Sequence, residues 1–154
     1  MVDYIQLVNT LTTTLRTIPE LVQELPNADP NRIVAYIDRN PVMNTLTNTI
    51  YEMKSGIILV TWEATRINDQ ENDAGMWVHK LIVYCRSDTG KSALDMVKLV
   101  IDGIPNPGDG QRWRNCAIMA GVLPVKITEA LRTPDREGID FYPVEMEFKE
   151  TGDA

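Results

Sequence analysis

The segment Gly90-Lys91-Ser92 stands between a predicted strand and a predicted helix, where a phosphate-binding loop would stand. That motif also needs a glycine five residues before Gly90, and Cys85 occupies this position. A loop with one glycine lacks the cluster of backbone N–H groups that cradles phosphates. We therefore interpret the segment as the capped start of a helix and expect no bound nucleotide.

His79 is the one histidine of the chain, so any histidine-based triad or metal cluster depends on it alone. It lies in an alternating stretch on the side of Trp77 and Leu81, which favours a hydrogen-bonded core histidine over a general base. Cys85 and Cys116 have no CxxC partner, and their apolar surroundings favour buried free thiols over a disulfide. We expect no catalytic residue, no metal, no cofactor and hence no enzyme.

Three carboxylates, Asp69, Glu71 and Asp73, fall at alternate positions, as calcium ligands can. The residues that follow lack the glycine and the distal glutamate of an EF-hand loop. A solvated loop is the simpler interpretation, and we count these side chains as candidate interface residues.

The cluster Arg112-Trp113-Arg114 is the one place where basic and aromatic side chains adjoin. Such a cluster can stack on a base or bind phosphate. In a chain with a formal net charge of -7, it more often marks a protein interface, where arginine and tryptophan are enriched.

Composition limits the remaining classes of function. The chain has 154 residues, 44% hydrophobic and 24% charged, which suits a single domain over residues 1–154 with frayed residues 151–154. Its acidity argues against sequence-independent binding to nucleic acid or to an anionic membrane. No signal peptide begins the chain and no apolar run reaches membrane-spanning length, so we expect a reducing cytoplasm.

The elements that position these residues are organised around two long predicted strands, residues 56–67 and 76–86. The acidic stretch 68–75 joins them as a hairpin tip, and the strands are long enough for the hairpin to project as an arm. Alternation in the first strand predicts Thr61, Glu63 and Thr65 on one side and Trp62 and Ala64 on the other. The half-polar side is a candidate contact surface, together with Arg66.

Helical periodicity predicts helices over residues 2–16, 19–25 and 88–104, with Thr17 beginning a capping box for the second. Asp88, Thr89 or Ser92 can cap the third. Strands are predicted over residues 32–37, 122–132 and 139–150, with a polar loop over 133–138. Pro143 predicts an edge or a bulge in the last strand. Residues 43–53 and 112–120 favour no single element.

This pattern predicts an α+β fold. Its sheet is mixed and mostly antiparallel, has about four to five strands including a long β-hairpin, and packs against an N-terminal helix and a central helix.

Several segments resemble the tail-terminator (tail-completion) proteins of long-tailed bacteriophages. They are Ile50-Tyr51-Glu52-Met53, residues 56–62, Trp77-Val78-His79, residues 100–105 and residues 138–142. The similarity covers most of the chain and includes the order of its elements. Two departures are Lys54-Ser55, where the family pattern has proline and small residues, and the acidic hairpin tip.

The resemblance implies a structural virion protein, assembled in the host cytoplasm as a homo-oligomeric ring, a hexamer. The ring caps the finished tail tube and then joins it to the neck of the DNA-filled head, with the tube protein and a head-completion protein as partners. Two alternatives stay open. One is a different neck component, such as a head-completion or stopper protein. The other is a small ligand-binding α+β domain that uses the Gly90 region.

A neck ring would let DNA pass without binding it specifically. Residues 138–154 hold five carboxylates and one lysine. The last strand is predicted to turn Asp140, Glu145 and Glu147 to one side. We therefore expect an acidic or neutral lumen, with these carboxylates as its candidate lining, because a basic lumen would bind phosphates and slow passage.

Overall fold

The computed structural model describes residues 3–36, 56–68, 76–87, 90–103, 122–130, 133–134 and 140–150. The helices are α1 (Tyr4–Arg16), α2 (Pro19–Gln23) and α4 (Gly90–Gly103), with short 3-10 turns η1 (Pro26–Ala28) and η2 (Pro30–Arg32). The strands are β1 (Ile33–Tyr36), β2 (Ile57–Asn68), β3 (Met76–Arg86), β4 (Val122–Ala130), β5 (Thr133–Pro134) and β6 (Asp140–Glu150). The stretches 43–53, 112–120 and 151–154 lie outside the described residues.

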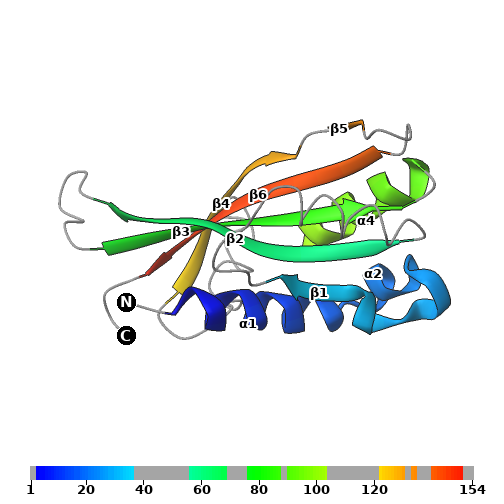
Figure 1. Cartoon of the computed structure of the whole chain (residues 1–154), viewed down its shortest axis with the longest axis horizontal. Coiled ribbons are helices and arrows are strands. Elements are labelled where there is room, and N and C mark those ends of the chain that lie inside the picture. Colours follow the sequence, from blue (N-terminus) through cyan, green and yellow to red (C-terminus); the bar gives the residue numbers. More distant parts are fainter. Residues whose placement is uncertain are drawn as a thin grey trace.

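The strands form one mixed sheet in the order β1-β2-β3-β6-β4, with the two-residue β5 also paired to β6. β1 runs parallel to β2, and every other described pair is antiparallel. The predicted α+β class, with its mixed and mostly antiparallel sheet, is confirmed (Figure 1). β5 is an addition, because it falls in the segment predicted to be a polar loop.

The prediction that Pro143 marks an edge strand or a bulge is wrong. β6 lies between β3 and β4, and its register with β3 is unbroken from Phe141 to Lys149. On its other side β6 pairs with β4 up to Val144 and with β5 from Phe141. Pro143 itself stands opposite Tyr84 of β3, inside the sheet rather than at its edge.

Helix α1 begins where Asp3 caps it, since the Asp3 carboxylate accepts from the Ile5 N–H at 2.9 Å. α2 begins at Pro19, a residue suited to the first helical turn. The predicted capping box before α2 does not form. The N-cap is Ile18, and the Thr17 hydroxyl instead donates to the Thr14 carbonyl oxygen at 2.6 Å.

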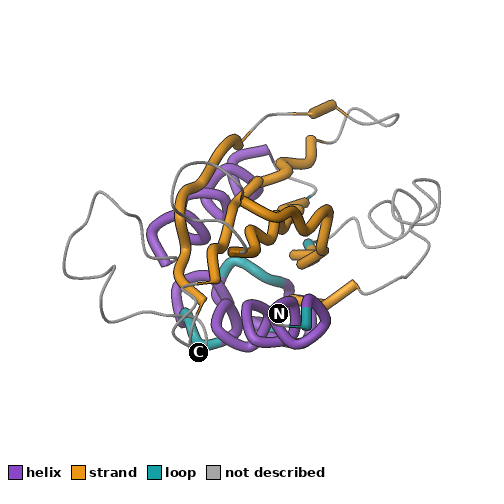
Figure 2. The backbone as a smooth tube through the Cα atoms, turned by 90° about the vertical axis from the view of Figure 1, so that its left-hand side faces the viewer, coloured by secondary structure: helices purple, strands orange, loops and turns teal. Residues whose placement is uncertain are grey.

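α1 and α4 cover the same face of the sheet, because their buried side chains share one core with it (Figures 1 and 2). That core contains residues from α1, α2, α4 and four strands. Its fully buried members are Leu7, Val8, Leu11, Leu15, Leu21, Ile33, Ile58, Val60, Leu81, Val83, Cys85, Ala93, Met96, Val100, Val144 and Phe148. The last strand turns Tyr142, Val144, Met146 and Phe148 into this core.

Gly56, just before β2, is required by its surroundings. Its φ is +143°, a value that side-chain-bearing residues rarely adopt. A Cβ there would also lie 2.9 Å from Cδ of Pro26. Arg32 Nε donates to the Gly56 carbonyl oxygen at 2.6 Å, so the turn before β1 also fixes the start of β2.

Candidate functional site

A β-bulge divides β2 into two halves. Trp62 pairs with Leu81 and Ala64 pairs with Lys80, so Glu63 is an extra residue between two adjacent positions of β3. Beyond the bulge the alternation is inverted, and Thr65 pairs with His79. The prediction that Thr61, Glu63 and Thr65 share one side is therefore wrong.

The members of that predicted polar side have separate environments. Thr61 is buried and donates to the Ile82 carbonyl oxygen at 3.1 Å. Glu63 is exposed at the bulge. Thr65 accepts a hydrogen bond from Trp62 Nε1 at 2.8 Å, which places these two side chains on one face of the sheet.

The outer face of the hairpin carries an ion-pair cluster centred on Lys80. Its Nζ lies 3.2 Å from Glu63 Oε2 and 3.3 Å from Glu145 Oε2, so one lysine links β2 to β6 across β3. The hydrogen bond that Lys80 donates to Glu63, supported by the one to Glu145, raises the pKa of Lys80. The Lys80 side chain is 29% exposed, which leaves this cluster at the surface.

A second ion pair lies further along the hairpin. Arg66 NH2 is 3.0 Å from Glu147 Oε1. The Arg66 side chain is 60% exposed, whereas that of Glu147 is 7% exposed. A buried carboxylate requires compensation by a partner, and the Arg66 guanidinium is one partner that stabilises the charge of Glu147.

On the helix-covered face, a chain of contacts connects α1 to the hairpin. The Tyr4 and Trp62 rings stack with centroids 4.4 Å apart, and Trp62 donates to Thr65. Thr65 Oγ1 lies 2.9 Å from Nδ1 of His79, which is fully buried. The prediction of a hydrogen-bonded core histidine is confirmed.

Figure 1 shows the paired ends of β2 and β3 extending past the start of α1. β1 pairs with β2 only as far as Thr61. Within the described residues, the later part of β2 therefore has a strand neighbour on one side only. Glu63, Ala64 and Arg66 are exposed there. The predicted projecting hairpin is thus seen in the strands, and its tip, with Asp69, Glu71 and Asp73, lies outside the described residues.

The remaining site predictions have mixed outcomes. Arg112, Trp113, Arg114 and Cys116 lie outside the described residues. The lumen stays a prediction, but two of its carboxylates are engaged in ion pairs, since Glu145 contacts Lys80 and Glu147 contacts Arg66. The backbone of Asp140 begins β6. The numbers of Asp140 and Glu145 differ by an odd amount, so regular strand alternation places their side chains on opposite faces of the sheet.

At the start of α4, the Ser92 hydroxyl donates to Glu24 Oε2 at 3.2 Å, which places a carboxylate beside the first turn. Ser92 lies inside α4, which begins at Gly90, so Ser92 is not its N-cap. Burial raises the pKa of the Cys85 thiol to about 12 and keeps it protonated. The described residues contain no group of three or more potential metal ligands, and no described helix is long and apolar enough to cross a membrane.

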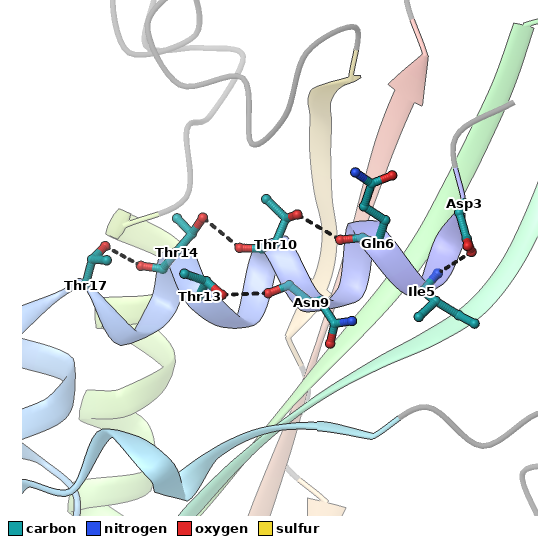
Figure 3. A pocket seen from close by; sticks show the side chains of 8 residues that line it. All are labelled: Asp3, Ile5, Gln6, Asn9, Thr10, Thr13, Thr14 and Thr17. Atoms are coloured by element: carbon teal, nitrogen blue, oxygen red, sulfur yellow. Dashed lines mark hydrogen bonds between the residues drawn. The ribbon is translucent and has the colours of Figure 1, made fainter.

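A shallow, open cavity of about 650 Å³ lies along α1. Figure 3 shows the residues that line it: Asp3, Ile5, Gln6, Asn9, Thr10, Thr13, Thr14 and Thr17. The threonine hydroxyls donate to backbone carbonyl oxygens of the same helix. Sequence reasoning did not single out this surface, nor Lys80. Lys80 stands opposite Glu147 of β6 and near Glu145. This proximity can be recognised only once the register between β3 and β6 is known.

No protein-family model matches the chain, and no curated protein matches its sequence.

Proposed function

We propose that the chain is a subunit of a homo-oligomeric ring that caps a bacteriophage tail tube and joins the tail to the head. The proposal starts from the sequence resemblance to tail-terminator proteins. The observation that supports it best is the exposed end of the β2–β3 hairpin, because a surface that projects from the core is suited to contact between subunits.

The charges on the exposed end of the β2–β3 hairpin favour contact there with a second copy of the chain. Each copy carries a formal net charge of -7, so contact between two copies is opposed by repulsion over most of their surfaces. On the outer face of the hairpin, Lys80 and Arg66 offset two of the three carboxylate charges of Glu63, Glu145 and Glu147. A second copy therefore meets less repulsion there than the net charge would suggest.

Addition of a strand to either edge of the main sheet is a less suitable mode of contact. β1 is four residues long, and the Arg16 guanidinium donates to the Ile33 carbonyl oxygen at 2.7 and 3.0 Å. β4 contains Pro124 and two register shifts, features that blunt an edge strand. Contact through the hairpin end avoids both edges.

The test is electron microscopy of the purified protein, alone and mixed with isolated tail tubes. Ala64→Arg places a long cation at the exposed hairpin end without removing a described ion pair. Leu94→Arg is the matched control, because Leu94 is 43% exposed on α4. We expect rings on tube ends for the wild type and for Leu94→Arg, and few or none for Ala64→Arg.

Equal ring formation by both variants would contradict the assignment of the hairpin end. Binding to tail-less heads instead of tube ends would favour a head-completion or stopper protein.

A further inference from the structure

The chain of contacts Tyr4, Trp62, Thr65 and His79, called the hairpin latch below, is a connection that the sequence did not reveal. It begins at Tyr4, the first residue of α1, and ends at His79, near the start of β3. Trp62 lies before the bulge and Thr65 after it. The latch therefore spans the point at which β2 changes direction.

The hydrogen bonds of Thr65 favour one tautomer of His79. Among described residues, the Thr65 hydroxyl has two partners, Trp62 Nε1 and His79 Nδ1. The indole N–H is only a donor, so Thr65 Oγ1 must accept from it. The same oxygen has a second lone pair, so it can either donate its hydrogen to Nδ1 of His79 or accept a bond from an Nδ1–H. Donation gives the hydroxyl hydrogen an acceptor, whereas acceptance gives it none among the described residues. This favours an unprotonated Nδ1, with the ring proton on Nε2.

We propose that His79 is a positioning residue: by accepting from Thr65 at Nδ1, it holds the bulge and fixes the direction in which the hairpin projects. Two features make the bond directional. His79 is fully buried, and in the register it stands opposite Thr65 on β2 and Phe148 on β6. The imidazole therefore cannot turn toward solvent, and the bulge is held from the helix-covered face as the Glu63–Lys80 pair holds it from the outer face.

The role of the latch in ring assembly rests on the proposed function, whereas the latch itself does not. A ring closes only if each subunit presents its contact at a fixed angle. A loose hairpin would leave a folded subunit that assembles poorly.

The first test uses the wild-type protein. Because the chain has one histidine, the imidazole nitrogen signals in an ¹⁵N NMR spectrum at neutral pH belong to His79. We expect a protonated Nε2 and an unprotonated Nδ1. A proton on Nδ1 would overturn the proposal, and this readout needs neither a variant nor ring assembly.

The second test compares two isosteric substitutions on the same strand. Thr65→Val removes the half-buried latch hydroxyl, and Thr61→Val removes a buried hydroxyl that donates to the Ile82 carbonyl oxygen. We expect Thr65→Val to accelerate amide hydrogen exchange in residues 64–68 by about tenfold or more, with residues 57–61 unchanged. Thr61→Val should not show this localised effect, and Thr65→Ser should restore protection. Unchanged exchange in Thr65→Val, or the same profile in both valine variants, would contradict the latch.

Discussion

Trp62 and Thr65 lie on the same face of β2, although they are three residues apart and a regular strand would place them on opposite faces. The indole Nε1 donates to the Thr65 hydroxyl at 2.8 Å. The bulge at Glu63 makes this possible, because one extra residue inverts the alternation of every side chain after it. The same inversion puts Ala64 and Arg66 on the outer face, which gives the hairpin end its exposed surface.

The Arg66–Glu147 pair gives a prediction about stability. Arg66→Ala should lower the free energy of unfolding by about 0.5–1 kcal/mol, a small value because Arg66 is largely exposed. Chemical denaturation of Arg66→Ala, Glu147→Gln and the double variant measures the coupling between the two residues. Strictly additive effects would show that the ion pair contributes nothing.

Alkaline pH should weaken the outer face of the hairpin. Pairing with Glu63 and Glu145 raises the pKa of Lys80 above 10.5, so its contribution to stability is complete below that pH and is lost as pH rises through the folded value. Thermal unfolding should therefore show the advantage of wild type over Lys80→Gln shrinking above about pH 10.5.

Ionisation of Tyr84 also lowers the stability of the fold at alkaline pH. Replacing Tyr84 therefore supplies the control for the Lys80 experiment. Burial, with the charges of Glu63 and Glu145, raises the pKa of Tyr84 above 10.0. The unfolded chain then ionises first, and stability falls with pH. Tyr84→Phe should remove this second part of the loss. If the difference between wild type and Lys80→Gln did not change with pH in a Tyr84→Phe background, the proposed lysine pairing would be wrong.

The assembled protein should not retain duplex DNA. A gel-shift assay at low and at physiological salt measures this directly. We expect no retained DNA at physiological salt, because the formal net charge is -7 and few phosphates can be neutralised. Tight binding that weakens steeply with salt would argue for a basic lumen and would make Arg112 and Arg114 phosphate-contact candidates.

Local patterns predicted most of the fold. The apolar stripe of α1 and the alternation of β3 gave the element boundaries to within about two residues, the usual precision of such patterns. The position of β6 inside the sheet was missed. Pro143 favours an edge when read alone, but the place of β6 between β3 and β4 is set by pairing with strands that are distant in the sequence.

The candidate site was less predictable than the fold. Glu63 and Arg66 were singled out, and both are exposed at the hairpin end. Their partners Lys80 and Glu147 come from other strands, so the pairs depend on register rather than on sequence spacing. A glycine inside a strand often marks a bulge, but the extra residue of this bulge is Glu63. The sequence therefore carries no sign of the bulge.

The most direct measurement of the central claim is the native mass of the protein in solution, alone and with isolated tail tubes, across a range of concentrations. The proposed function predicts a closed hexamer, formed by the protein alone or once tubes are present and reduced by Ala64→Arg. A wild-type protein that stays monomeric under both conditions at every concentration would contradict the ring.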